Sequence, residues 1–85
     1  MQTKDDSAYS PWEEVARQVL VAEMKRKRVS YKQLSRLLES AGIVEEPGQL
    51  NRKVNRKTFS AAFLLACLAV LEADAVPLRW PKTES

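Results

Sequence analysis

The stretch from Gln49 to Lys57 contains the residue types that pair with the edges of DNA bases. Arginine donates two hydrogen bonds to guanine, and asparagine or glutamine pairs with adenine. Only Leu50 and Val54 are apolar in this stretch, and their spacing predicts a helix held by two anchors. A short hydrophilic surface helix without a partner would have the same composition. The expected base contacts are Gln49, Arg52, Asn55 and Arg56.

Positive charge is concentrated around that stretch. Ten of the fourteen lysine and arginine residues fall between Lys25 and Lys57 with only three acids, giving +7 in a chain of net charge +3. Such a surface attracts polyanions through counterion release, and nucleic acid is the commonest of them. The cluster at 25–28 has a second interpretation, because cations at a helix C-terminus also offset the macrodipole and improve solubility. The expected phosphate contacts are Lys25, Arg26, Lys27, Arg28, Lys32, Arg36, Lys53 and Lys57.

The sequence offers little for catalysis. It has no histidine and one cysteine, so nucleophile–base pairs and metal-ligand spacing are absent. The two glycines, Gly42 and Gly48, form no phosphate-binding loop. Cys67 lies in an apolar run and is expected in the core. We therefore expect no enzyme, no metal, no cofactor and no small-molecule substrate.

Size and composition indicate one small folded domain. The chain has 85 residues, of which 45% are hydrophobic. A single cysteine forms no internal disulfide, and the first ten residues are too polar for a signal peptide, which predicts a cytoplasmic location. The longest uncharged run, 58–71, is shorter than the roughly 20 residues that cross a bilayer, so we expect no membrane partner. Marginal size favours a homodimer.

Two capping boxes predict the first two helices. Ser10-Pro11-Trp12-Glu13 combines a capping hydroxyl, a proline at the first helical position and a glutamate three residues after the cap, and the helix runs to about Arg28. Ser30-Tyr31-Lys32-Gln33 repeats the pattern and starts a helix that extends to Ala41. Gly42 then stops that helix.

Two further helices and a tail follow. The third helix, 49–57, comes after a loop from Gly42 to Gly48 that carries Glu45 and Glu46. The fourth helix runs from about Ala61 to Ala73, with Ser60 or Thr58 as its cap.

The chain therefore divides into a flexible N-terminus (1–9), a helical domain (10–75) and an extended tail (76–85). The tail contains two prolines, which exclude a helix, and it carries Trp80. Trp80 either packs on the chain's own core or contacts a partner, which includes a second copy of the chain.

Several segments together resemble a small bacterial family catalogued only as a domain of unknown function. The resemblance covers roughly residues 12–78, and the last segment is its most specific part. The segments are Trp12, Tyr31-x-x-Leu34-x-x-x-Leu38-x-x-x-Gly42, Leu50-Asn51-x-Lys53-Val54-x-Arg56, and Thr58-Phe59-Ser60-Ala61-Ala62-Phe63-Leu64-Leu65-x-Cys67-Leu68.

The helix order of that family looks like the lambda-repressor-like helix-turn-helix fold of small bacterial and phage regulators. This likeness implies an all-α domain of four helices with an extended C-terminal tail. In it, Tyr31–Ala41 corresponds to the first helix of the motif and Gln49–Lys57 to the recognition helix. The loop from Gly42 to Gly48 departs from the usual turn of three or four residues, and its two acids would lie near the DNA backbone.

Two function hypotheses follow. The first is a non-catalytic DNA-binding protein, a transcriptional regulator of a bacterium or mobile element, that docks helix 49–57 in the major groove of double-stranded DNA. The second is a protein–protein interaction module, an adaptor or small accessory protein that keeps the helix-turn-helix-like fold without binding DNA. The acids Glu45 and Glu46 and the tryptophan of the tail, Trp80, favour the second hypothesis. A steep salt dependence of binding would favour the first.

Overall fold

A computed structural model describes residues 6–81 of the chain, and these form an all-α fold without strands. The four helices confirm the fold class predicted from the sequence. A 3-10 helix, Asp6–Ala8, precedes them. The helices are α1 (Ser10–Lys27), α2 (Tyr31–Ser40), α3 (Pro47–Arg56) and α4 (Ala61–Val70).

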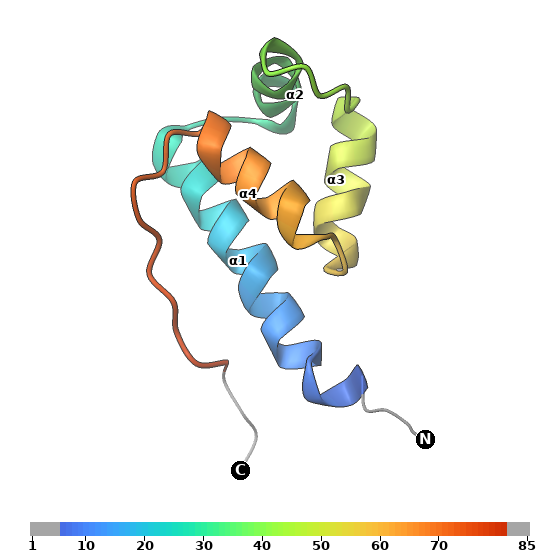
Figure 1. Ribbon diagram of the computed structural model, residues 1–85, viewed down its shortest axis with the longest axis vertical. Helices are drawn as coiled ribbons and strands as arrows, with labels where there is room; N and C mark the ends of the chain where they lie inside the picture. Colours follow the sequence, from blue (N-terminus) through green and yellow to red (C-terminus); the bar gives the residue numbers. More distant parts are fainter. Residues whose placement is uncertain (1–5, 82–85) are drawn as a thin grey trace.

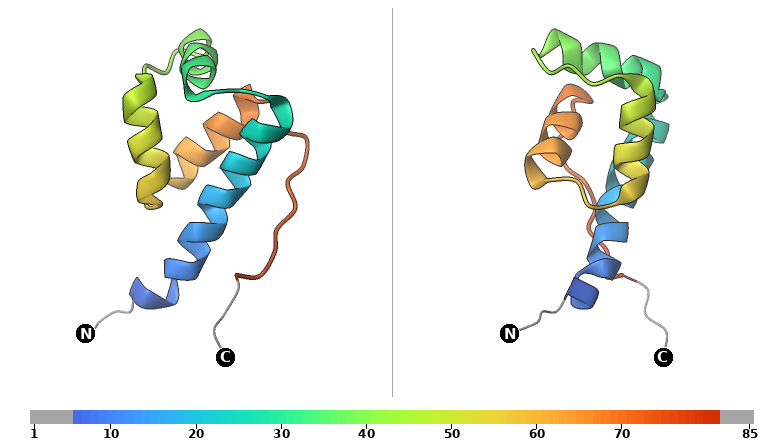
Figure 2. Two further views of the ribbon diagram at one scale, coloured as in Figure 1. Left: turned by 180° about the vertical axis from the view of Figure 1, so that it is seen from behind. Right: turned by 90° about the vertical axis from the view of Figure 1, so that its right-hand side faces the viewer.

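The helices pack around a core to which each of them contributes. α4 lies against α1, and α2 contacts both α3 and α4 (Figure 1). In the side view of Figure 2, α2 runs across the ends of α3 and α4. After α4 the chain turns back and runs beside α1 as an extended tail (Figure 1).

The core consists mainly of leucines. Leu50 and Val54 are fully buried and hold α3 on the core, as their spacing predicts. Ile43, from the loop before α3, packs against the same cluster. The buried members of the core cluster are Leu20, Met24, Leu34, Leu38, Leu50, Val54, Cys67 and Leu71.

The predicted start of α2 is confirmed, and the predicted start of α1 is wrong by one residue. The Ser30 amide donates to Gln33 Oε1 at 2.8 Å, and the Gln33 amide donates to Ser30 Oγ at 3.2 Å. Ser10, by contrast, is already helical, and Tyr9 caps α1 without a side-chain hydrogen bond. A capping residue normally has an extended backbone, but Tyr9 follows a 3-10 turn and has helical angles.

α3 starts earlier and ends earlier than the predicted 49–57. Pro47 occupies the first turn, and the backbone amide of Glu46 donates to Gln49 Oε1 at 3.2 Å. Lys57 has a left-handed backbone and ends the helix. The loop between α2 and α3 is therefore residues 41–46, shorter than the predicted Gly42–Gly48.

α4 ends at Val70, before the predicted Ala73. Glu72 has a left-handed backbone, with φ 60°, and the Ala73 amide donates back to the Leu68 carbonyl at 3.0 Å. This bond closes the helix in the way that Gly42 closes α2. The residue with the left-handed backbone is here a glutamate and not a glycine, so the sequence does not mark the end of the helix. None of the described helices is long and apolar enough to cross a membrane.

Candidate nucleic-acid interface

The outward face of α3 carries two arginines without an internal partner. An α-helix advances roughly 100° per residue, so Arg52 and Arg56 lie on the side opposite Leu50 and Val54. Both arginines are exposed, and neither forms a hydrogen bond or ion pair with any residue that the structure describes. Their guanidinium groups are therefore available to an external acceptor.

A shallow hollow of about 320 Å³ lies beside these arginines. Gln49 also borders it; its Oε1 accepts the bond from the Glu46 amide, which leaves its amide nitrogen as a donor. The hollow is lined by Glu45, Gln49, Arg52, Lys53 and Arg56. Three cations and one acid give this surface a net positive charge.

Lys53 is held inward and is less available than the sequence suggests. Its Nζ lies 2.5 Å from Glu45 Oε2 and 4.8 Å from the centre of the Phe63 ring. Ser35 Oγ of α2 donates to the Glu45 carbonyl oxygen at 2.5 Å. Glu45 is 16% exposed at its side chain, so the ion pair with Lys53 largely cancels the acid that would oppose a phosphate.

Asn55 is engaged with α1 and with its own helix. Its Oδ1 accepts from Arg17 Nε at 3.0 Å, and its Nδ2 donates to Asn51 Oδ1 at 2.6 Å. Both ends of the side-chain amide are therefore occupied. A bidentate contact from Asn55 to adenine needs Nδ2 as a donor, so it requires one of the two bonds from Nδ2 to Asn51 to open.

Lys57 is also tied to α1. Its Nζ lies 3.0 Å from Glu14 Oε1, and Arg17 approaches the other oxygen of Glu14 at 3.4 Å. The bond from Lys57 is the main cause that lowers the pKa of the Glu14 carboxyl below its ordinary value of 4.5. These contacts fasten the C-terminal end of α3 to α1.

The remaining predicted phosphate contacts fall into two groups. Arg26 pairs with the buried Glu23 at 2.6 Å, which raises the pKa of the Arg26 guanidinium, and Lys27 donates to the Glu72 carbonyl at 3.3 Å. The other group has no side-chain partner within residues 6–81 and is exposed. It consists of Lys25, Arg28, Lys32 and Arg36.

The structure thus brings together three of the four predicted base contacts, Gln49, Arg52 and Arg56. It turns Asn55 towards α1. The cationic end of α1 is not part of the same surface, because Figure 1 places the turn from α1 to α2 on one side of the molecule and α3 on the other. Sequence reasoning missed Arg17 and Glu45 as the residues that hold the α3 side chains, since nothing in their spacing marks these long-range contacts.

Two other predicted features concern Cys67 and Trp80. Cys67 is fully buried, and desolvation raises the pKa of its thiol to about 12. Within the described range, no three His, Cys, Asp or Glu side chains gather as a metal site requires. Trp80 does not join the core: it is 84% exposed, and its ring packs edge-on against Trp12 at 5.2 Å between centroids.

The fold and this surface define a small all-α protein with a third helix that is basic and held by two apolar anchors. Over residues 12–76 the sequence matches the model of a family described as a domain of unknown function (DUF6471). The chain belongs to this family, which confirms the resemblance found in the sequence. No curated protein and no solved structure gives a significant match to the chain.

Proposed function

We propose that the protein binds double-stranded DNA through the outward face of α3 and serves as a transcriptional regulator of a bacterium or mobile element. The observation that carries this proposal is the pair Arg52 and Arg56, both exposed and both without an internal partner. An unpaired arginine costs folding free energy only when it is buried, and Arg52 and Arg56 are exposed to solvent. Their guanidinium groups can therefore pair with base edges.

The relation between α2 and α3 supports a helix-turn-helix of the lambda-repressor type. α2 lies across the end of α3, which leaves the length of α3 open to a groove (Figure 2). The long connection at 41–46 is compatible with this docking because its two acids are not equivalent. Glu45 is paired with Lys53, and Glu46 stands at the N-terminus of α3, where a negative charge is favoured by the helix dipole.

In this mechanism Arg52 and Arg56 reach guanine edges, and Gln49 reaches an adjacent base. Phosphate contacts come first from the unpaired cations Lys32 and Arg36 of α2, the helix that crosses the backbone in such complexes. Lys53 and Lys57 must exchange an internal ion pair for a phosphate, so each adds less affinity than an unpaired cation.

Replacing Arg52 tests the proposal at its centre. After selection of the preferred duplex, Arg52→Ala should weaken binding to it by about 1–3 kcal/mol and leave random duplex less affected. Anisotropy titrations of both duplexes at one salt concentration measure the difference. Lys53→Ala, on the same helix, is the matched control and should weaken both duplexes equally.

An equal loss for Arg52→Ala on every duplex would make Arg52 a phosphate contact and remove the base-reading role from it. If the wild-type chain binds no duplex even at low salt, the DNA proposal fails. The interaction module without DNA contacts is then the better hypothesis.

A further inference from the structure

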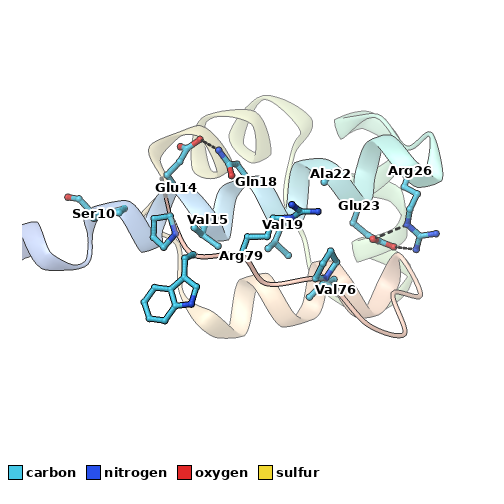
Figure 3. Close-up of a pocket in the computed structure, with 14 residues that line it drawn as sticks. Ser10, Glu14, Val15, Gln18, Val19, Ala22, Glu23, Arg26, Val76 and Arg79 are labelled. Atoms are coloured by element: carbon cyan, nitrogen blue, oxygen red, sulfur yellow. Dashed lines mark hydrogen bonds and ion pairs between the residues drawn. The ribbon is translucent and has the colours of Figure 1, made fainter. Parts of the chain in front are cut away.

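A groove runs between α1 and the tail, and its walls are mainly apolar. Val15 and Val19 line it from α1 without belonging to the core cluster, and Val76 and Trp80 line it from the tail (Figure 3). Its volume is about 750 Å³, within the range of roughly 300–1,000 Å³ that is usual for ligand sites. The tail leaves Trp80 84% exposed, so this part of the groove is open to a ligand.

The groove is too narrow for a helix. Its lining extends along α1 from Ser10 to Arg26, a length of about 24 Å at 1.5 Å per residue. Dividing the volume by this length gives a mean cross-section of about 31 Å². A helix with its side chains is at least about 10 Å across, which corresponds to roughly 80 Å². The shape therefore suits a thin linear chain such as an alkyl chain.

The two acids of the lining are neutralised by other residues of the same chain. Glu14 pairs with Lys57 at 3.0 Å and with Arg17 at 3.4 Å. The buried Glu23 pairs with Arg26 at 2.6 Å. Neither carboxylate therefore offers a free charge to a cationic ligand, and each has a cation beside it that offsets its repulsion of an anionic one.

Arg79 is the one charged residue of the lining that forms no ion pair or hydrogen bond with any residue from 6 to 81. Figure 3 shows its side chain reaching from the tail towards α1 beside Val19. A guanidinium group can donate two parallel hydrogen bonds to a carboxylate. An unpaired guanidinium beside an apolar groove therefore matches a ligand that combines an alkyl chain with a carboxylate.

We propose that the groove between α1 and the tail binds a medium-chain fatty acid. Arg79 holds the carboxylate, and the alkyl chain runs along Val15 to Trp80 and covers the exposed indole ring. From Val19 to Pro11 the lining continues for about 12 Å of α1, which sets the length of chain that it can cover.

The ligand is bound and not chemically changed, so it is not a substrate. The proposal does not depend on nucleic-acid binding, because Arg52 and Arg56 lie on α3, outside the groove lining.

The test is a titration of the full chain with sodium decanoate, at concentrations where decanoate is monomeric, followed by tryptophan fluorescence. Trp12 and Trp80 are the two tryptophans of the chain, and they touch each other, so the emission reports on the groove. We expect a saturable shift to shorter wavelengths as the alkyl chain covers Trp80. Butyrate, which has the same carboxylate on a shorter chain, should bind at least about tenfold more weakly.

Arg79→Gln separates recognition of the charge from the shape of the groove. It should raise the dissociation constant for decanoate about tenfold, because it removes the charged hydrogen bonds, and leave that for uncharged decanol unchanged. The matched control is Arg28→Gln, which removes an exposed arginine outside the groove lining and should bind decanoate like the wild type.

The absence of a saturable shift with decanoate would overturn the proposal. So would decanoate binding that Arg79→Gln leaves unchanged. An equal loss of decanoate and decanol binding in Arg79→Gln would also overturn it, since Arg79 would then shape the groove without recognising a carboxylate.

Discussion

At the scale of single residues, Leu50 is one of the two buried anchors of α3. It is fully buried, whereas the other long side chains of the helix except Val54 reach the surface. Leu50→Ala should lower the free energy of unfolding by about 2–5 kcal/mol, because it leaves a cavity in the core. Urea denaturation followed by circular dichroism measures this loss.

Leu65→Ala is the matched substitution on α4. Leu65 is 65% exposed, so its truncation should change the free energy of unfolding by less than about 0.5 kcal/mol. If Leu50→Ala lowered the free energy of unfolding no more than Leu65→Ala does, α3 would not depend on its two buried anchors.

The sequence predicts the anchors of α3 but not the state of its polar residues. Leu50 and Val54 can be recognised because four-residue spacing places both on one helix face. The ion pair of Lys53 and the hydrogen bond of Asn55 cannot be recognised in the sequence, because their partners Glu45 and Arg17 come from a loop and from α1. Such contacts depend on the packing of whole elements, which local spacing does not encode.

At the scale of elements, the two serines that resemble helix caps should differ in their effect on stability. Ser30 is hydrogen-bonded as the cap of α2, whereas Ser10 lies inside α1 and makes no capping bond. Ser30→Ala should lower the free energy of unfolding by about 1 kcal/mol. Ser10→Ala should leave it within about 0.5 kcal/mol, because alanine is a good helix former.

Thermal denaturation of both variants makes the comparison. A large loss for Ser10→Ala would restore the capping role that the sequence pattern predicts. No loss for Ser30→Ala would mean that the hydrogen bonds at the start of α2 do not contribute to stability.

The contact between α1 and α3 should make stability depend on pH at the acid end. Lys57 lowers the pKa of the Glu14 carboxyl in the folded chain, so the ionised form stabilises the fold above the ordinary value of 4.5. That contribution is lost as the pH falls through the lowered pKa. It should be below about 1 kcal/mol, because the pair is partly exposed.

Glu14→Gln should therefore be less stable than the wild type at pH 7, and the two melting temperatures should converge as the pH falls through the lowered pKa of Glu14. Glu13→Gln is the control, since the structure shows no ion pair for Glu13 among the described residues. A difference for Glu14→Gln that stays constant down to low pH would contradict the role of the Glu14 charge.

Helix boundaries show where element-level prediction succeeds. The end of α2 is predictable because Gly42, with φ 86°, is the residue type that adopts a left-handed backbone at no steric cost. The end of α4 cannot be predicted in the same way. Glu72 adopts the left-handed backbone there, with φ 60°, and the apolar pattern continues past it. Tertiary packing rather than residue type determines this helix end.

At the scale of the whole molecule, four helices can be predicted because capping patterns and apolar spacing agree along most of the chain. The groove beside α1 cannot be predicted in this way, since Val15 and Val19 resemble core positions until the core is seen to use a different face of the helix. The same arrangement separates two surfaces. Arg52 and Arg56 lie on α3, and the apolar groove lies between α1 and the tail.

The most direct test of the central claim is an anisotropy titration of a labelled random-sequence duplex at salt concentrations between about 50 and 200 mM. If Lys32 and Arg36 both meet phosphates, the logarithm of the affinity should fall with the logarithm of the salt concentration with a slope of about −1.8. Arg52→Glu with Arg56→Glu should abolish binding. The control variant, Lys4→Glu with Lys82→Glu, changes the net charge by the same amount at the chain ends. It should retain most of the DNA binding. Absence of salt-dependent binding by the wild type, or an equal loss in both double variants, would contradict DNA binding through α3.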